Sequence, residues 1–246
     1  MYKKGIYEIA ANEPLTADVR RMILKGDTQW IERPGQFVNI ELDGFYLRRP
    51  ISICDYDDST ITLIYKVVGR GTEAMSRMAA GTKLDLLTGL GNGFDPEVGC
   101  RRPLLVGGGV GVPPLYRLAK ELLARGREVT VVLGFNTAAE IFYEEEFRAL
   151  GAEVYVSTAD GSKGTKGFVT DAIRGNAVDF DYFYACGPLP MLRALCECCT
   201  QSGELSFEER MGCGFGACMG CSCKTLAGNK RICKDGPVMK REDIIW

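Results

Sequence analysis

The segment PLLVGGGVGVPP, residues 103–114, joins an apolar run to a helical pattern through four glycines. The same alternation continues along the chain, where the apolar runs EVTVVLGF, AEVYVSTAD and DYFYACG are separated by amphipathic stretches such as PPLYRLAKELLARG and AEIFYEEEFRALG. This alternation is typical of a parallel sheet covered by helices. We therefore predict an α/β domain over residues 101–203.

The residues before this segment have a different pattern. Short apolar runs with β-branched residues alternate with turn residues in GQFVNIEL, YLRRPISIC, STITLIYKVV and TKLDLLTGL. Period-two patterning of this kind predicts antiparallel strands, and their number and spacing favour a small barrel over residues 1–100. The interruption GRGTEAMSRMAAG predicts one short helix.

The remaining segment, residues 204–246, is rich in cysteine and glycine and too short to build its own hydrophobic core. In ERMGCGFGACMGCSCKT, residues 209–225, Cys213, Cys218 and Cys221 follow the spacing C-x4-C-x2-C, and Cys233 follows after eleven intervening residues. Three close cysteines and one remote cysteine are the order of plant-type ferredoxins, whose four thiolates hold a [2Fe–2S] cluster. We expect these four cysteines to bind such a cluster.

Glycines between the cysteines favour the cluster, because a backbone without side chains can wrap closely around an inorganic core. They are Gly212, Gly214, Gly216 and Gly220. Zinc is the alternative, although only one C-x2-C half is present, and unliganded thiols are a third possibility. Cys223 is expected to point away and pack, with the option that it replaces Cys221.

Composition limits the function classes. The 246 residues are 46% hydrophobic and carry interspersed charges with a net charge of −2, so no basic field favours nucleic acid or an anionic membrane. Because the amino terminus has no apolar signal region, we expect a cytoplasmic location, where eleven cysteines indicate metal binding or redox chemistry rather than disulfides. The chain has no histidine, which removes imidazole as a ligand and as a general base.

Two stretches of the barrel region suggest phosphate binding. Arg49, Pro50, Ile51 and Ser52 form an R-P-x-S pattern on a predicted strand, where an arginine can bind a pyrophosphate with two hydrogen bonds. By itself this pattern also fits an exposed strand with a surface arginine. Gly71 and Thr72, at the start of the predicted helix, would add amides and a hydroxyl for the same diphosphate.

The glycines of residues 107–111 indicate a nucleotide-binding turn, but they do not follow the strict G-x-G-x-x-G pattern, since Val112 stands where a third glycine would. Close packing of strand on helix explains them equally well. Cys186, in YACGP, ends a predicted strand at the edge where α/β sheets bind ligands, or is a buried strand cysteine. Cys196, Cys198 and Cys199 are expected to be buried on the following helix.

These motifs, in this order over residues 49–188, resemble the ferredoxin–NAD(P)+ reductase superfamily. The tail ERMGCGFGACMGCSCKT with RICKDGP is most similar to the electron-transfer subunits of type B dihydroorotate dehydrogenases. The resemblance covers nearly the whole chain and implies an FAD-binding barrel (1–100), an NAD-binding α/β domain (101–203) and a [2Fe–2S] module (204–246).

The resemblance also implies site residues. FAD would be bound by the R-P-x-S residues, by a second strand and by the helix start: Arg49, Pro50, Ile51, Ser52, Ile64, Tyr65, Lys66, Gly71 and Thr72. NAD would lie near the glycine turn and two strand ends: Gly108, Gly109, Gly111, Asp160 and Cys186. Electrons would pass from an FMN-containing catalytic subunit through the cluster and FAD to NAD+ in pyrimidine biosynthesis, in a heterotetramer with two copies of each subunit.

The order of cofactors also follows from their chemistry. A cluster moves single electrons, nicotinamide moves two as hydride, and a flavin does both, so the flavin must lie between them. No side chain is placed to deprotonate a carbon acid, so we expect the substrate chemistry on another polypeptide. The alternatives are a flavin subunit of another enzyme, of the sulfite reductase or ferredoxin:NADP+ oxidoreductase type, and a non-enzymatic, metal-stapled redox sensor.

Overall fold

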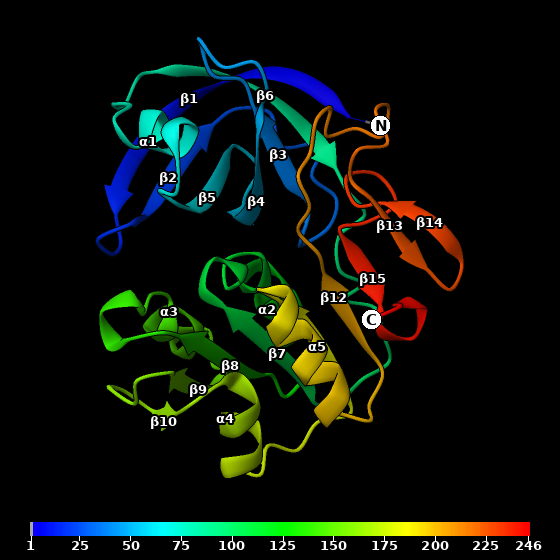
Figure 1. Cartoon of the computed structure of the whole chain (residues 1–246). Coiled ribbons are helices and arrows are strands. Elements are labelled where there is room, and N and C mark those ends of the chain that lie inside the picture. The colour runs from blue at the N-terminus through cyan, green and yellow to red at the C-terminus, as the bar shows by residue number, and fades with distance from the viewer. Residues whose placement is uncertain (1) are drawn as a thin grey trace.

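The chain, seen in a computed structural model that describes residues 2–246, forms two large bodies with a small third part beside them (Figure 1). The first body is a closed antiparallel barrel in the order β1-β2-β5-β4-β3-β6. Its strands are β1 (Lys3–Pro14), β2 (Val19–Lys25), β3 (Phe37–Ile40), β4 (Arg49–Tyr56), β5 (Thr60–Lys66) and β6 (Lys83–Leu90). The predicted barrel is confirmed, and the predicted short helix is α1 (Arg70–Ser76).

Alternation along β5 explains how the barrel meets the second body. Ile61, Leu63 and Tyr65 point into the barrel core, as period-two side chains on one strand face must. Ile64 lies on the opposite face and packs with residues of the α/β body. The outer face of this strand is therefore buried as well as the inner one.

The second body is a seven-stranded sheet in the order β10-β9-β8-β7-β11-β12-β15. All neighbours are parallel except β12 and β15, which are antiparallel. The strands are β7 (Pro103–Gly108), β8 (Thr130–Phe135), β9 (Glu153–Thr158), β10 (Thr165–Lys166), β11 (Tyr182–Cys186), β12 (Gly203–Ser206) and β15 (Val238–Lys240). The predicted parallel sheet is confirmed.

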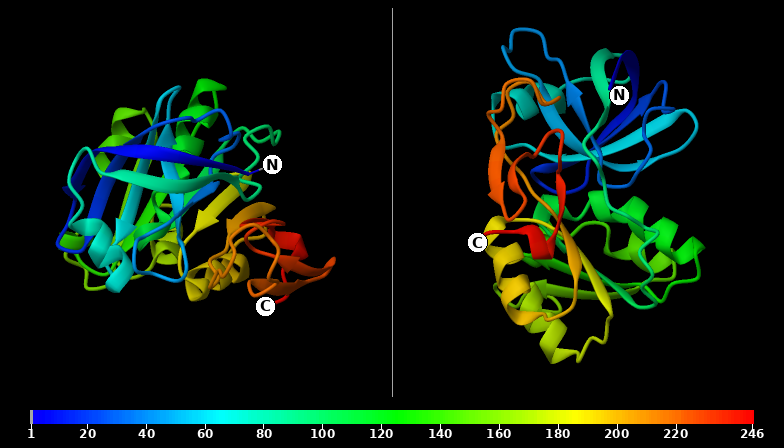
Figure 2. Two further views of the ribbon diagram at one scale, coloured as in Figure 1. Left: turned by 90° about the horizontal axis from the view of Figure 1, so that it is seen from above. Right: turned by 90° about the vertical axis from the view of Figure 1, so that its right-hand side faces the viewer.

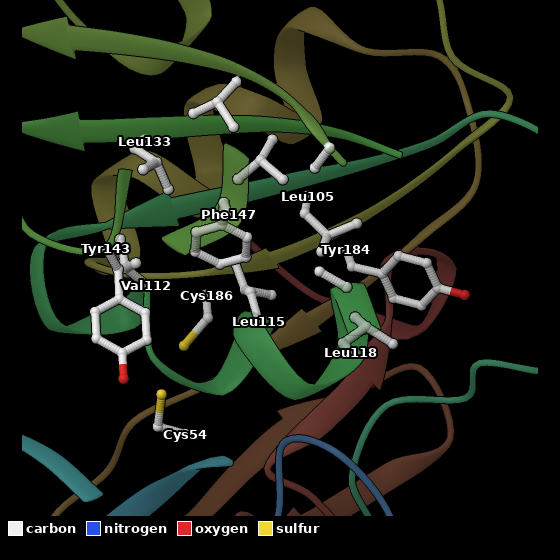
Figure 3. Packing of buried hydrophobic residues seen from close by; sticks show 14 of the residues in the cluster. Cys54, Leu105, Val112, Leu115, Leu118, Leu133, Tyr143, Phe147, Tyr184 and Cys186 are labelled. Atoms are coloured by element: carbon white, nitrogen blue, oxygen red, sulfur yellow. The ribbon is translucent and has the colours of Figure 1, made fainter. Parts of the chain in front are cut away.

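Helices cover both faces of this sheet. They are α2 (Pro114–Ala124), α3 (Glu144–Ala149), α4 (Val169–Gly175) and α5 (Leu189–Cys198). Leu115 of α2 and Phe147 of α3 belong to the core on the face turned to the barrel, which also includes Cys54 of β4 (Figure 3). Ile173 of α4 and Leu195 of α5 belong to the core on the other face. The barrel therefore packs directly on the α2 and α3 layer.

The predicted helical stretch AEIFYEEEFRALG is interrupted. A short 3-10 turn, η2 (Ala138–Glu140), and the helix α3 flank Tyr143, whose φ of 65° is left-handed. A regular helix cannot include a residue in this conformation. Helix α4 and strands β1, β2, β10, β12 and β15 were not among the predicted elements.

The cysteine-rich segment is not separate from the two bodies. Its hairpin of β13 (Ser222–Thr225) and β14 (Gly228–Arg231) lies beside them, whereas β15 joins the sheet through β12 (Figure 2). Ile232 and Met239 pack against Phe37 and Leu90 of the barrel. The segment thus shares a core with the barrel, as its small size requires. No helix within residues 2–246 has the length and apolar character needed to cross a membrane.

Candidate functional site

The four predicted cluster cysteines are arranged as two pairs. Cys213 is paired with Cys218 and Cys221 with Cys233, because in each pair the backbone amide of one residue donates to the sulfur of the other. Each pair contains a sulfur that accepts backbone hydrogen bonds: Cys213 Sγ from Ala217 N at 3.2 Å and Cys218 N at 3.4 Å, and Cys221 Sγ from Cys233 N at 3.4 Å. Within residues 2–246, no three acidic, thiol or imidazole side chains converge on a single metal-ion position. Two thiol pairs match a group with two irons, each taking two thiolates.

The thiols differ in how easily they ionise. Burial opposes ionisation of Cys213, but the backbone amides of Cys218 and Phe215 outweigh it and lower its pKa to about 6. Burial raises the pKa of Cys233 to about 12, and contact with Cys221 contributes in the same direction. The loop of residues 213–218 therefore already stabilises a thiolate, which is the form that binds metal.

Cys223 has a different neighbour from the four predicted ligands. Its Sγ lies 3.9 Å from Met239 Sδ in the core shared with the barrel, whereas Cys221 Sγ accepts the amide of Cys233. This difference supports the quartet with Cys221 rather than with Cys223. Gly216, with a φ of 92°, brings its backbone so close to Lys234 that an added Cβ would lie 2.5 Å from that side chain.

The structure brings Arg49 of the R-P-x-S pattern together with the helix start. A Cβ on Gly71 would lie 2.1 Å from Arg49 Nε, so only glycine allows the guanidinium to rest on this turn. Two guanidinium groups lie over the Phe45 ring, with Arg49 4.8 Å and Arg70 6.0 Å from its centroid. Two cations on one ring form a concentrated positive site suited to a diphosphate.

The other predicted flavin residues differ in whether their polar groups already have hydrogen-bond partners within the chain. The Thr72 hydroxyl donates to Gly69 O and accepts from the amides of Val68 and Gly69, so it caps its own helix, which begins at Arg70. On β5, the Tyr65 hydroxyl donates to Asn12, the Lys66 ammonium pairs with Asp18 at 2.9 Å, and Ile64 is buried. These β5 side chains have partners within the chain, and their backbone pairs with β2 on one side. On the other side β4 pairs with β5 only from Ile61 to Leu63, which leaves that side of the Ile64–Lys66 backbone for a ligand.

Pro50, Ile51 and Ser52 remain on β4, where they pair with β3. Ser52 lies opposite Phe37 and Pro50 opposite Asn39. The strand of the pattern is therefore next to the strand that faces the cysteine segment.

The predicted NAD residues gather at the carboxyl ends of neighbouring strands. Gly108 ends β7, Cys186 ends β11, and Asp160 follows β9. A Cβ on Gly111 would lie 2.2 Å from the Cys186 carbonyl oxygen, so this glycine serves close packing, whereas Gly109 (φ 53°) has open space around it. Asp160 accepts hydrogen bonds from Ser162 N and Oγ at 2.9 and 2.6 Å. Ligands of α/β sheets bind at this edge.

Glu208 is a neighbour of Cys186 that the sequence analysis missed. Burial raises the Cys186 pKa to about 12, and the negative charge of Glu208 raises it further. Glu208 itself is exposed. Because Ser206 of β12 pairs with Cys186 of β11, Glu208 is brought to the carboxyl edge of the sheet by β12, a strand that the sequence patterns had not predicted.

The fold and these sites define the class of protein: an oxidoreductase of the ferredoxin–NAD(P)+ reductase fold with an added iron–sulfur segment. A solved NADH-dependent reduced ferredoxin-NADP oxidoreductase superposes with a TM-score of 0.89 and 31% identity, covering 98% of this chain and 90% of that one. A ferredoxin NADP+ reductase from Neisseria gonorrhoeae with bound FAD and NADP shares the fold at 17% identity and a TM-score of 0.69, covering 80% of this chain and 92% of that one.

The model of the iron–sulfur cluster binding domain of dihydroorotate dehydrogenase B matches residues 208–245, and the oxidoreductase NAD-binding domain model matches residues 105–197. The electron transfer subunit of dihydroorotate dehydrogenase B (NAD+) from Fusobacterium nucleatum is 45% identical over 96% of both chains, and that from Bacillus caldolyticus is 48% identical over 88% of both. The chain belongs to this family of electron transfer subunits.

Family membership confirms the predicted function: an oxidoreductase subunit that transfers electrons and acts with a catalytic partner subunit. The predicted cofactors, an iron–sulfur cluster, FAD and NAD, are confirmed at the level of the domains. The reading as a non-enzymatic sensor is not supported.

Proposed function

We propose that electrons enter this subunit at a [2Fe–2S] cluster on Cys213, Cys218, Cys221 and Cys233 and leave as hydride on NAD+. The observation that carries this proposal is the pairing of the four thiols beside backbone amides that already lower the pKa of Cys213. When bound, the cluster supplies one-electron transfer, FAD exchanges one or two electrons, and nicotinamide accepts hydride.

The chain's own residues bind and orient these groups. Arg49 and Arg70, which both contact the Phe45 ring, would neutralise the FAD diphosphate, and the missing side chain of Gly71 leaves room for the Arg49 guanidinium. We propose that β4 (Arg49, Pro50, Ile51, Ser52), the backbone of Ile64, Tyr65 and Lys66, and Gly71 with Thr72 line the flavin. The contact between the barrel and the α2 layer would keep water from one side of the flavin.

NAD would bind at the carboxyl edge of the sheet, near Gly108, Gly109, Gly111 and Asp160. The open space at Gly109 and the strand ends support this location. Cys186, whose thiol stays protonated because its pKa is raised to about 12, would lie near the nicotinamide as an uncharged surface. Hydride transfer between stacked rings requires no side-chain acid or base, in agreement with the absence of histidine.

We propose that the catalytic partner contains FMN, that the assembly is a heterotetramer with two copies of each subunit, and that residues 208–240 form the docking face. Met219 and Leu226, apolar side chains of this segment, are 54% and 72% exposed. We also propose a three-part division at residues 100 and 203, in which β12 and β15 link the last part to the sheet. We further propose a cytoplasmic location, because the sequence has eleven cysteines and those within residues 2–246 are all free of disulfides.

The test compares two reactions of the isolated chain. It should oxidise NADH with an artificial dye, because the FAD and NAD sites lie within it, but it should not oxidise dihydroorotate. Adding the catalytic subunit should give dihydroorotate:NAD+ electron transfer. Charge reversal at Lys234 or Arg210, on the proposed docking face, should weaken that coupled reaction more than the NADH–dye reaction. Rapid dihydroorotate oxidation by the isolated chain would show that the substrate site is on this polypeptide.

A further inference from the structure

Asn39 is a buried polar residue between the barrel and the cysteine segment. It lies on β3 and is 1% exposed. Its neighbours Val38 and Ile40 point into the barrel core, whereas Phe37 packs with Cys221 and Cys233. Because side chains on a strand alternate, Asn39 faces the cysteine segment together with Phe37. Its backbone pairs with Pro50, in the strand proposed to bind FAD.

The Asn39 amide holds the beginning of the cysteine loop. Asn39 Nδ2 donates to the carbonyl oxygen of Cys213 at 3.2 Å, a contact between residues 174 positions apart. The loop backbone lies directly on this amide, since a Cβ on Gly214, whose φ is 78°, would be 2.3 Å from Nδ2. One side chain of the barrel thus fixes the peptide group of a proposed cluster ligand.

The other end of the amide has no partner. Asn39 Oδ1 is buried and accepts no hydrogen bond from residues 2–246. A buried acceptor without a partner costs free energy, so the oxygen end of the amide does not stabilise the chain. The polar contact that an amide provides at this position is the one from Nδ2 to the Cys213 carbonyl oxygen.

We propose that Asn39 is a positioning residue that sets the redox potential of the cluster through the Cys213 loop; this inference rests on the proposed cluster ligands. Cys213 Sγ accepts hydrogen bonds from Ala217 N and Cys218 N, and their geometry depends on where the Cys213 peptide is held. Hydrogen bonds to ligand sulfur stabilise the more negative, reduced cluster and raise its potential. Releasing Cys213 from Asn39 weakens them and makes the potential more negative.

The experiment uses the full chain with its cofactors and compares Asn39→Leu with Asn92→Leu. Asn92 is the matched control because it also joins the barrel side to the carboxyl-terminal segment, with Nδ2 donating to Val238 O at 2.7 Å and to Asp235 O at 3.4 Å and Oδ1 accepting from Val238 N at 3.1 Å. None of these hydrogen bonds goes to a proposed cluster cysteine. The readouts are an anaerobic redox titration of the cluster, the electron paramagnetic resonance spectrum of the reduced cluster, and the melting temperature.

Asn39→Leu should shift the cluster potential to more negative values and change its spectrum, and it should also lower the melting temperature because the Cys213 carbonyl oxygen loses its donor. Asn92→Leu should lower the melting temperature and leave potential and spectrum unchanged. Asn39→Ala, which removes the donor without adding a larger side chain or a charge, should shift the potential in the same direction and provides the measurement if the leucine variant does not fold. Wild-type potentials in both Asn39 variants would overturn the assignment of Asn39 alone, whereas a wild-type chain without iron and sulfide would overturn the cluster site as well.

Discussion

At the scale of single residues, the cluster loop and the proposed flavin site each depend on residues that few other residue types could replace. The cluster loop has two thiols that differ in environment although they are two positions apart: Cys221 accepts the Cys233 amide, and Cys223 contacts Met239. Arg49 rests on Gly71, where any larger residue would collide with it. Both features lead to predictions that distinguish a residue that binds a cofactor from a nearby residue of the same type that does not.

Cys221→Ser should lose or distort the cluster, and Cys223→Ser should retain it, because only the first removes a sulfur of the two pairs. Iron and acid-labile sulfide, two of each expected per wild-type chain on the plant-type ferredoxin pattern, measure the outcome together with the visible spectrum. The opposite result, with Cys223→Ser losing the cluster and Cys221→Ser keeping it, would reverse the ligand assignment.

Arg49→Ala should weaken FAD binding by roughly 1.5–3 kcal/mol, the range for a lost charge-assisted hydrogen bond, which corresponds to about ten- to hundredfold in the dissociation constant. Flavin fluorescence during titration of the flavin-free chain measures it. Arg77→Ala is the control, because Arg77 lies at the end of α1 and pairs only with the exposed Glu73. Equal FAD affinity in the Arg49 variant and the control would mean that the strand arginine has only a structural role.

At the scale of elements, the contact between the β7 turn and the end of β11 determines the shape of the nucleotide edge. Gly107 and Gly111 allow the chain to pass close to Val112 and to the Cys186 carbonyl, while Gly109 leaves space. The two explanations of the glycine run, close packing and ligand binding, therefore apply to different glycines of the same segment.

Gly111→Ala should destabilise the chain by about 1–3 kcal/mol, as overpacking against fixed backbone does, and should weaken NADH binding because β11 has to move. Thermal unfolding and the KM for NADH in the dye reaction measure the two effects. Gly175→Ala is the control, since an added Cβ on Gly175 in α4 meets no atom within 4 Å. If Gly111→Ala behaves like this control, the close approach to Cys186 does not constrain the sheet.

At the scale of the whole molecule, the barrel, the sheet and the cysteine segment meet around a cavity of about 260 Å³. Glu204 of β12 lines it, is 5% exposed, and accepts a hydrogen bond from Asp95 N at 2.9 Å. Burial raises its pKa to about 7, the hydrogen bond from the Asp95 amide and the positive charges of Lys240 and Arg33 oppose the increase, and the negative charge of Asp95 adds to it. A buried carboxylate at this junction makes the stability of the assembled chain depend on pH.

Glu204 predicts the sign of that dependence. Its pKa is higher in the folded chain, so the folded state binds its proton more tightly, and stability should fall as the pH rises from about 4.5 to about 7, by on the order of 2–3 kcal/mol. Glu204→Gln should remove this loss and melt at a higher temperature than the wild type at pH 8, with a smaller difference at pH 5. Glu197→Gln, an exposed control on α5, should match the wild type at both pH values. A wild-type melting temperature for Glu204→Gln at pH 8 would contradict the prediction.

The sequence by itself determined the classes of the two bodies, the family and the cysteine spacing, because these depend on local periodicity and on residues close together in the chain. AEIFYEEEFRALG shows the limit of periodicity, since tertiary packing holds Tyr143 in a left-handed conformation that breaks the expected helix. Only the tertiary structure decided which distant residues meet: Arg49 with Gly71, Cys186 with Glu208, and Asn39 with Cys213. Such contacts depend on strand order, and β12 and β15 are too short for a local pattern to reveal that they bring the carboxyl-terminal segment onto the sheet and beside the barrel.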